Sequence, residues 1–316
     1  MSFLDRSRDV AAREAISGAA SALAQAHNAL NTAHPRALDQ LEAAVDALWR
    51  DYLDKLHAIA QTLGPLGQIE LADRWVRTGW EEFMDRLDFP DEERVQVLEK
   101  LHALNLSLGT YDFSFDLIQP LLEHAARNHH RTPRLLDVAS GSGGFPIAVA
   151  RLVRAKGLPL HVVGSDIQPA LVDRATERAH QAGVDVRFRV IDASQMEFDL
   201  GSFDVVTILQ AAHHLTPGRL ARVIFEAVRV ATTAFVAIDG IRAPWLSPLA
   251  ALGTMASSGN PWLAHDAFVS ALRMYDRAEL TLIARAACPG SVVQCTAPFP
   301  TVNMLQVYAM GVEPAH

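Results

Sequence analysis

The sequence predicts an α/β protein with a doubly wound, mostly parallel sheet of seven strands and an all-helical segment ahead of it. Two observations lead to this prediction. From residue 134 onward, short runs rich in β-branched residues alternate with helical stretches, which specifies a parallel sheet with helices on both faces. Before residue 130, apolar residues instead recur at steps of three and four, as they do along the buried face of a helix.

Four helices are predicted in the N-terminal segment. The longest begins just after Pro35 and ends at Gly64–Pro65, and apolar residues from Leu38 to Leu63 form one stripe along it. The others are expected at residues 10–30, 68–87 and 91–106. The stripe must be buried, and the sequence leaves open whether it packs in an appended helical domain or forms a dimer interface.

The strands are predicted after the polar, proline-containing stretch Asn128–Pro133. We therefore expect a helical domain at residues 1–130, for dimerisation or for covering a substrate, and a sheet domain at residues 131–316. Five strands are expected at residues 134–139, 160–166, 185–192, 202–210 and 233–240, and a closing pair at residues 291–299 and 301–310. An apolar insert at residues 242–275 interrupts the alternation, and we expect it to form either a lid or a packing helix pair.

The composition excludes several classes of function. The formal net charge of −8 at pH 7 argues against nucleic acid as a partner, because phosphate binding relies on clustered lysine and arginine. Cys288 and Cys295 have neither CxxC spacing nor a nearby histidine pair, so we expect no metal site and reduced thiols in a cytoplasmic protein. No apolar run approaches the roughly 20 residues that a membrane span needs, and the N-terminus does not resemble a secretory signal.

Residues 135–146, LLDVASGSGGFP, predict a strand followed by a ligand-binding glycine turn. A Walker phosphate loop is excluded because no lysine follows the glycines. A dinucleotide fingerprint starting at Gly141 would need a glycine where Pro146 stands, and Asp137 would repel an incoming pyrophosphate. The remaining interpretation is an acid-x-G-x-G-x-G turn with one substitution, made of Asp137, Ala139, Gly141 and Gly143. Its acid favours S-adenosylmethionine, which carries an ammonium and a sulfonium group and no phosphate.

Acids also end the next two predicted strands. Asp166 could accept hydrogen bonds from both hydroxyls of a ribose, although NAD-dependent enzymes place an acid there as well. Asp192 could accept a hydrogen bond from the adenine amino group, while the backbone N–H of Ala193 donates to the ring. Either acid could instead be an ordinary turn residue.

Four blocks in this order, LDVASGSGG, VGSDIQPALVDRA, IDASQMEF and SFDVVTILQAAHHLT, resemble the class I S-adenosylmethionine-dependent methyltransferases. Within that class, the chain is similar to the branch of the ubiquinone and menaquinone biosynthesis methyltransferases. The resemblance runs from about Leu135 to Met310 and implies a Rossmann-like fold. The family usually has glycine where Ala139 stands, and we expect the extra methyl group to be tolerated if this residue keeps an extended backbone.

The resemblance also implies which residues contact the cofactor. The methionine part is expected at the glycine turn, the ribose at the second strand, the adenine at the third, and the amino group at a backbone carbonyl after the fourth. In that order, the implied residues are Asp137, Gly141 and Gly143 with Ala139 beside them, Asp166 with Ile167, Asp192 with Ala193, and Gln210.

Methyl transfer from a sulfonium is an in-line displacement, so a base is needed only if the acceptor arrives protonated. The candidate bases are His213 and His214 after the fourth strand and His265 in the insert. One of the first two could merely cap the next helix or bind backbone, and the insert that carries His265 could be only a packing helix pair. Contacts with the acceptor are expected from aromatic and charged residues at the cover and insert, namely Tyr111, Arg242, Trp262 and Tyr275.

We therefore predict a cytoplasmic enzyme that methylates a small, aromatic or otherwise apolar molecule, on oxygen, in biosynthetic tailoring. A homodimer through the N-terminal helices is compatible with this prediction. Two alternatives stay open on the sequence alone. One is an NAD-dependent oxidoreductase, and the other is a non-catalytic protein that keeps the cofactor-binding fold, which the departure at Ala139 leaves possible.

Overall fold

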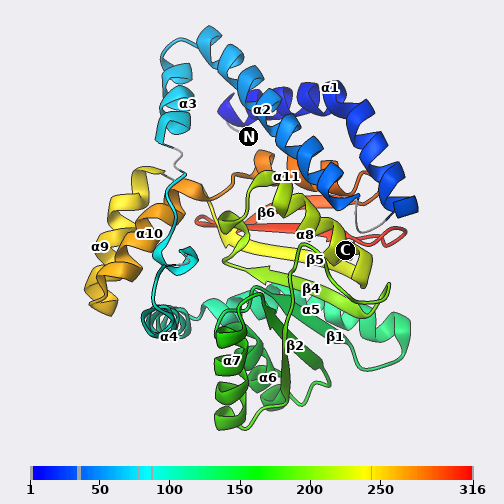
Figure 1. Ribbon diagram of the computed structural model, residues 1–316, viewed down its shortest axis with the longest axis vertical. Helices are drawn as coiled ribbons and strands as arrows, with labels where there is room; N and C mark the ends of the chain where they lie inside the picture. The colour runs from blue at the N-terminus through cyan, green and yellow to red at the C-terminus, as the bar shows by residue number, and fades with distance from the viewer. Residues whose placement is uncertain (1–2, 34–36, 77–78, 87, 243, 315–316) are drawn as a thin grey trace.

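The computed structural model describes residues 3–33, 37–76, 79–86, 88–242 and 244–314, and its centre is one seven-stranded sheet (Figure 1). The strands are β1 Arg134–Val138, β2 His161–Asp166, β3 Val186–Val190, β4 Phe203–Leu209, β5 Ala231–Gly240, β6 Val293–Phe299 and β7 Val302–Tyr308. They lie in the order β3-β2-β1-β4-β5-β7-β6, and β7 runs in the direction opposite to the other six strands. The predicted fold class is confirmed.

The central strands β1, β4 and β5 are almost entirely buried because helices cover both faces of the sheet. Along β1, Leu135 packs into the hydrophobic cluster on one face and Leu136 into the cluster on the other. Helices α5 (Thr110–His129), α6 (Gly144–Lys156) and α7 (Pro169–Ala182) cover the first face, and α8 (Pro217–Val230) and α11 (Arg277–Ala287) cover the second. This arrangement leaves the carboxyl ends of the parallel strands at one edge.

The first two helices form an outer layer over α8 and α11. Helix α1 (Phe3–Ala33) packs along α2 (Leu38–Thr62), and α2 packs on α8. Gly218 of α8 permits this approach, because a Cβ there would lie 2.5 Å from the backbone oxygen of Glu42. The apolar stripe of α2, including Leu41 and Tyr52, is buried in the same hydrophobic cluster as the sheet. The stripe therefore completes the core of this chain, while the domain boundary near residue 130 stays a prediction.

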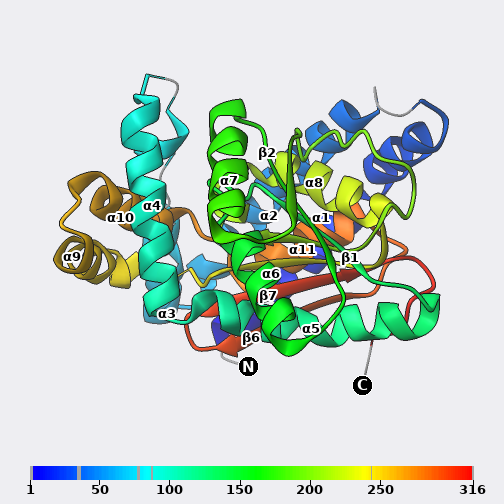
Figure 2. The ribbon, with the colours of Figure 1, turned by 90° about the horizontal axis from the view of Figure 1, so that it is seen from below.

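A second group of helices stands beside the edge where the parallel strands end (Figures 1 and 2). From the N-terminal segment come α3 (Pro65–Val76), the short 3₁₀ helix η1 (Phe83–Asp85) and α4 (Asp91–Ser107), and from the insert come η3 (Pro244–Leu246), α9 (Ser247–Ser258) and α10 (Pro261–Arg273). Helix α10 contacts α4, η1 and the 3₁₀ helix η2 (Ala212–His214) that follows β4. Segments far apart in the sequence therefore meet at the strand ends.

The helix expected at residues 68–87 is shorter than predicted. It ends at Val76, and residues 79–82 are not helical. Gly79 stands at this interruption, and glycine costs about 1 kcal/mol relative to alanine inside a helix. The non-helical stretch carries Glu82 to the edge of the sheet, where it becomes part of the site.

Candidate active site

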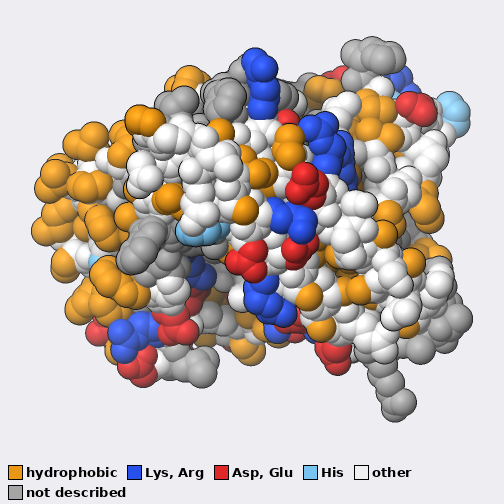
Figure 3. Space-filling view, turned by 90° about the horizontal axis from the view of Figure 1, so that it is seen from above, with side chains coloured by type: hydrophobic (Ala, Val, Ile, Leu, Met, Phe, Trp, Pro, Cys, Tyr) orange, Lys and Arg blue, Asp and Glu red, His pale blue; other side chains and the backbone are white. Residues whose placement is uncertain are grey.

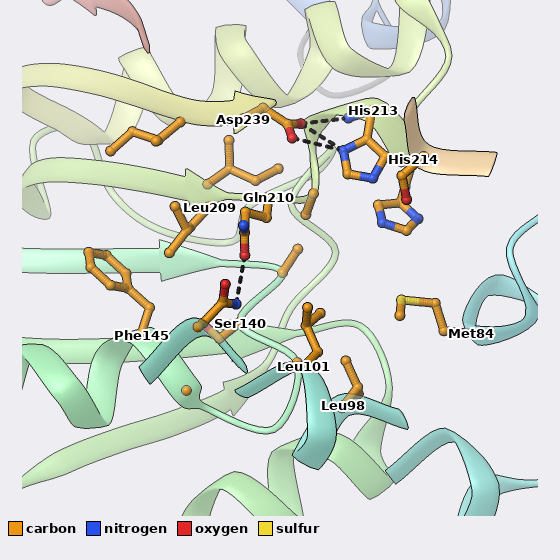
Figure 4. Close-up of a pocket in the computed structure, with 18 of the residues that line it drawn as sticks. Met84, Leu98, Leu101, Ser140, Phe145, Leu209, Gln210, His213, His214 and Asp239 are labelled. Carbon is orange, nitrogen blue, oxygen red and sulfur yellow. Dashed lines mark hydrogen bonds and ion pairs between the residues drawn. The ribbon is translucent and has the colours of Figure 1, made fainter. Parts of the chain in front are cut away.

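A cavity of about 650 Å³ lies beyond the carboxyl ends of the parallel strands, where ligands bind in open α/β sheets (Figure 4). Its polar half consists of strand-end residues such as Ser140 and Gln210. Its apolar half consists of covering residues such as Met84, Leu98 and Leu101. The volume is in the range of small-molecule sites in proteins.

Asp137, at the end of β1, is a buried acid on the cavity wall. Its Oδ2 accepts a hydrogen bond of 2.7 Å from Ser140 Oγ, and its Oδ1 accepts one of 2.8 Å from Thr207 Oγ1. Burial nevertheless raises the pKa of Asp137 to about 7, because the two hydroxyl groups only partly replace lost water. A cationic ligand such as S-adenosylmethionine would relieve this cost.

The turn after β1 has a left-handed backbone at Ala139, the position where the family usually has glycine. Ala139 has a φ of 53°, so the extended backbone under which its methyl group would be tolerated is not present. An L-residue in this region costs about 1–2 kcal/mol, because its Cβ approaches the following carbonyl oxygen. The next glycine, Gly141, has a φ of 55° at no such cost. Both residues line the cavity.

The two glycines that follow permit close packing on opposite sides of the turn. A Cβ at Gly143 would lie 2.6 Å from the ring of Phe188, so this glycine lets β3 approach and stands outside the cavity wall. A Cβ at Gly144 would lie 2.4 Å from Tyr111 Oη and 2.7 Å from His102 Nδ1. Gly144 therefore lets the covering helices approach, whereas the resemblance had placed Gly143 at the ligand.

The acids at the ends of β2 and β3 both line the cavity. Asp166 Oδ2 accepts a hydrogen bond from the N–H of Gly141 (2.9 Å), which ties the second strand end to the glycine turn. Asp192 accepts hydrogen bonds from Ser194 and forms an ion pair of 3.0 Å with Arg219. Burial alone would raise the pKa of Asp192, but these partners lower it below its usual range. The neighbouring predicted residues, Ile167 and Ala193, also line the cavity.

Gln210 directly follows β4 and has a left-handed backbone, at a φ of 53°. Its side-chain oxygen accepts a hydrogen bond of 2.8 Å from Asn105 of α4 (Figure 4). The same Asn105 lies against Tyr111, which also lines the cavity. The N-terminal cover is therefore hydrogen-bonded directly to the strand end where the resemblance places the cofactor's amino group.

Two histidines lie where the polar and apolar halves meet (Figure 4). His213 Nδ1 is 2.8 Å from Asp239 Oδ2 at the end of β5, and His214 Nδ1 is 2.8 Å from Asp85 Oδ2 in η1. Because an ionised carboxylate can only accept, Nδ1 carries the proton in each neutral ring and Nε2 keeps its lone pair. Burial opposes ionisation of Asp239, but the contact with His213 lowers its pKa below the usual range.

Glu82 faces both rings and was missed by sequence reasoning. Its Oε1 lies 3.5 Å from His213 Nε2, and its Oε2 lies 3.7 Å from His214 Nε2. Burial raises the pKa of Glu82 to about 7, and Oε1 has no hydrogen-bond partner among the described residues. Glu82 comes from the loop between α3 and η1, so neither a strand end nor a motif marks it in the sequence.

Residues 135–233, which contain β1 to the start of β5, match the family model of a methyltransferase domain. The matched stretch includes the glycine turn, the strand-end acids and both histidines. The chain carries a class I S-adenosylmethionine-dependent methyltransferase domain. S-adenosylmethionine is therefore its cofactor, and the alternative of an NAD-dependent oxidoreductase is wrong.

Three similar proteins match this chain over different parts of its length. An uncharacterized protein of Mycobacterium tuberculosis is 29% identical over 194 residues, which are 58% of this chain and 68% of the relative. The 27-O-demethylrifamycin SV methyltransferase of Amycolatopsis mediterranei is 38% identical over 99 residues, 31% of this chain and 34% of the relative. The crystal structure of magnesium protoporphyrin IX methyltransferase from Synechocystis is 14% identical, with a TM-score of 0.45, and covers 76% of this chain and 94% of that one.

Two of the residues expected to bind the acceptor, Arg242 and Tyr275, lie outside the cavity wall. Arg242 is buried and forms an ion pair of 2.9 Å with Asp73 of α3, so it joins the insert to the N-terminal segment. Tyr275 is buried as well, and its hydroxyl donates a hydrogen bond of 2.6 Å to the carbonyl of Leu215. Both side chains hold covering elements in place.

Two further candidates, His265 and Trp262 of α10, also lie outside the wall. His265 packs against the ring of Phe83, and its Nδ1 lies 3.0 Å from Asp266. Trp262 contacts the other edge of this aromatic group, with its ring centroid 4.5 Å from that of Phe83. These residues fasten α10 to η1, which carries the acid beside His214.

Among the described residues, no helix combines the length and the apolar character that crossing a bilayer requires.

Proposed function

We propose that this methyltransferase acts on a hydroxyl oxygen of a small, aromatic or otherwise apolar acceptor, as a step of biosynthetic tailoring. The position of His213 carries the proposal, because this ring lies between the cofactor half and the apolar half of the cavity. Its Nδ1 is held by Asp239, so its Nε2 is available to a hydroxyl group. The name of the Amycolatopsis relative specifies a demethylated oxygen, which supports oxygen as the target.

The polar half would hold the cofactor through charge and hydrogen bonds. The buried carboxylate of Asp137 would face the cationic methionine part, and the acids of the next two strands would face the ribose and the adenine. The proposed residues all line the cavity. They are Asp137, Ala139 and Gly141 for the methionine part, Asp166 and Ile167 for the ribose, Asp192 and Ala193 for the adenine, and Gln210 for the amino group.

The cover makes the acceptor half of the cavity apolar. Met84 of η1, Leu98 and Leu101 of α4, and Leu263 and Met274 of the insert line it. Removing apolar surface from water yields about 25 cal/mol per Å², so such walls favour an apolar or aromatic acceptor.

The insert is proposed as a lid over this half. Ala250 and Thr254 of α9 line the cavity. On the outer side of α9, Leu249 is 62% exposed and Leu252 is 67% exposed, and hydrophobic side chains gather over α9 and α10 at the left of Figure 3. An exposed apolar patch of this kind is typical of a ligand or interaction site. Its position beside the cavity supports a role in admitting an apolar acceptor.

We also propose that residues 1–130 serve as a substrate cover. Two observations support this role over dimerisation. Elements η1, α4 and the start of α5 line the cavity, and the apolar stripe of α2 is already buried within the chain.

S-adenosylmethionine supplies an electrophilic methyl group. The residues of the chain have to place the acceptor oxygen in line with that group, keep water out, and receive the hydroxyl proton. His213 Nε2 is positioned for the proton, and Asp239 would stabilise the ring after the proton arrives.

The test compares acceptors that differ only in the reacting group. Small phenols, their methyl ethers and the matching anilines are incubated with the enzyme and S-adenosylmethionine, and S-adenosylhomocysteine and the methylated product are measured by mass spectrometry. We expect turnover with the phenols alone. Methylation of a ring carbon, or equal rates with the anilines, would overturn the oxygen assignment.

Two variants test the assigned residues in the same assay. His213→Ala should lower turnover by about 10²–10⁴-fold, whereas His180→Ala, at an exposed histidine of α7 away from the cavity wall, is the matched control that should keep it. Asp166→Ala should weaken cofactor binding, and unchanged affinity in that variant would refute the assignment of the polar half.

A further inference from the structure

Three side chains of the types that bind metals converge at the edge of the cavity. The Nε2 atoms of His213 and His214 and the carboxylate of Glu82 provide ligand atoms that all lie within 4.8 Å of one another. The carboxylate presents a different oxygen to each ring, at 3.5 Å and 3.7 Å. The side chains of Glu82 and His213 are only 2% and 5% exposed, so this convergence lies inside the protein.

The Nδ1 atom of each ring also contacts a second carboxylate. Asp239 accepts the Nδ1–H of His213, and Asp85 accepts the Nδ1–H of His214. Carboxylates in this position fix the tautomer and orientation of metal-binding histidines and raise the basicity of the other ring nitrogen. Figure 4 shows the two rings side by side, with Asp239 joined to His213 by dashed lines. Both Nε2 lone pairs are therefore prepared for one shared ligand near Glu82.

We propose that Glu82, His213 and His214 bind one divalent transition-metal ion of the zinc type. Two imidazoles and one carboxylate, with a fourth position left for water or substrate, form a ligand set of catalytic zinc sites. Ligand atoms about 2.1 Å from a tetrahedral metal lie about 3.4 Å from one another. The Nε2 atoms of His213 and His214 lie 3.5 Å from Oε1 and 3.7 Å from Oε2 of Glu82, respectively, which is close to this spacing, and the three ligand atoms all lie within 4.8 Å of one another.

The neighbouring cation, Arg273, does not replace the metal. Its Nη1 lies 3.7 Å from Glu82 Oε1, but this guanidinium is engaged with Asp85 at 3.1 Å and with the carbonyl of His214 at 2.9 Å. Glu82 Oε1 remains without a hydrogen-bond partner in the part of the chain that the structure describes. A cluster built only for packing would be expected to satisfy a buried carboxylate oxygen, whereas a metal site keeps it available for the ion.

The metal site rests on the proposed function, because the open position would take the acceptor's hydroxyl oxygen. Coordination lowers the pKa of a bound hydroxyl group, so its O–H bond breaks and the proton passes to solvent. The oxygen then forms a bond to the methyl carbon, and the C–S bond breaks with its electron pair on sulfur. With the ion bound, the Nε2 lone pair of His213 is used for coordination, so the ion takes the place of His213 as the group that promotes loss of the hydroxyl proton.

The experiment measures metal binding directly on the full chain, apart from methyl transfer. Chelator-treated protein is titrated with Zn²⁺ by calorimetry and with Co²⁺ by visible absorption, and Mg²⁺ serves as the hard-cation control. The variants are Glu82→Gln, His214→Ala and Asp85→Asn, with Glu81→Gln as the matched control because it is an exposed neighbouring acid. Circular dichroism and S-adenosylhomocysteine affinity verify that each variant is folded.

We expect one equivalent of Zn²⁺ or Co²⁺ to bind the wild type and Glu81→Gln alike. Asp85→Asn should weaken binding about 10–100-fold, and loss of the ligand in Glu82→Gln or His214→Ala should weaken it more. No stoichiometric binding by folded wild type, or equal binding by folded Glu82→Gln, would overturn the site. Stoichiometric binding without methylation of any hydroxyl acceptor would leave the metal site standing and refute the proposed acceptor chemistry.

Discussion

The buried carboxylate of Asp137 should make cofactor binding depend on pH. Burial raises its pKa to about 7 in the free protein, and a cationic ligand beside it would favour the ionised form. With a pKa of about 7, roughly a tenth of the protein is ionised here at pH 6 and roughly nine tenths at pH 8. If binding requires the ionised form, the association constant for S-adenosylmethionine should rise about tenfold between these pH values.

Calorimetric titration at several pH values from 6 to 8 measures this dependence. The Asp137→Asn variant is the control, because it keeps the titration of the ligand's own amino group and removes that of the carboxylate. We expect weaker binding by the variant and a smaller change with pH. Equal pH dependence in both proteins would refute the assignment of Asp137 to the cationic end of the cofactor.

The raised pKa of Asp137 also makes the stability of the ligand-free protein depend on pH. The pKa of Asp137 is higher in the folded chain than the ordinary 3.8, so the folded state binds more protons between these values. The contribution of Asp137 is therefore most favourable below pH 3.8 and is lost as the pH rises through about 7. Between pH 5 and pH 8, the unfolding free energy of the wild type should therefore fall relative to that of Asp137→Asn, as measured by denaturant titration at each pH.

Three further substitutions test individual contacts. Ala139→Gly should raise the unfolding free energy by about 1 kcal/mol, because it removes a left-handed alanine, and an unchanged or lower melting temperature would contradict this. Gly144→Ala should displace the cover through its clash with Tyr111 and raise KM for the acceptor more than Kd for S-adenosylhomocysteine, whereas Gly253→Ala, which meets no neighbour, should change neither. Asp239→Asn should lower turnover on the order of 100-fold with cofactor affinity kept, and a loss of affinity alone would mean that Asp239 acts on the cofactor.

The sheet and its cofactor half could be predicted because both follow from short-range patterns. Buried parallel strands appear as apolar runs, and each strand begins and ends within two residues of the run that predicted it. Residues that end neighbouring parallel strands must meet at one edge, so Asp137, Asp166 and Asp192 could be assigned to one site from the sequence alone. The backbone angle of Ala139 could not be predicted, because the identity of a residue does not fix φ.

Helix α5 does not follow from the apolar periodicity of the sequence, although the resemblance implies helices ahead of the first strand and α5 packs on one face of the sheet. It begins after Gly109, which has a left-handed backbone, and it contains Pro120. Both residues normally indicate a break in a helix. Here the packing of buried residues such as Phe115 and Ile118 in the core outweighs the local cost.

The acceptor half of the site depends on contacts between segments that are distant in the sequence. Glu82 approaches His213 and His214 across more than a hundred residues, and Arg242 joins the insert to α3. A charged residue in such a contact looks like any surface residue until its partner is known, which is why the sequence pattern indicates Arg242 as an acceptor contact and does not indicate Glu82. If the apolar half of the cavity holds the acceptor, as proposed, changes in the N-terminal segment or the insert should alter acceptor choice and leave the affinity for S-adenosylmethionine unchanged.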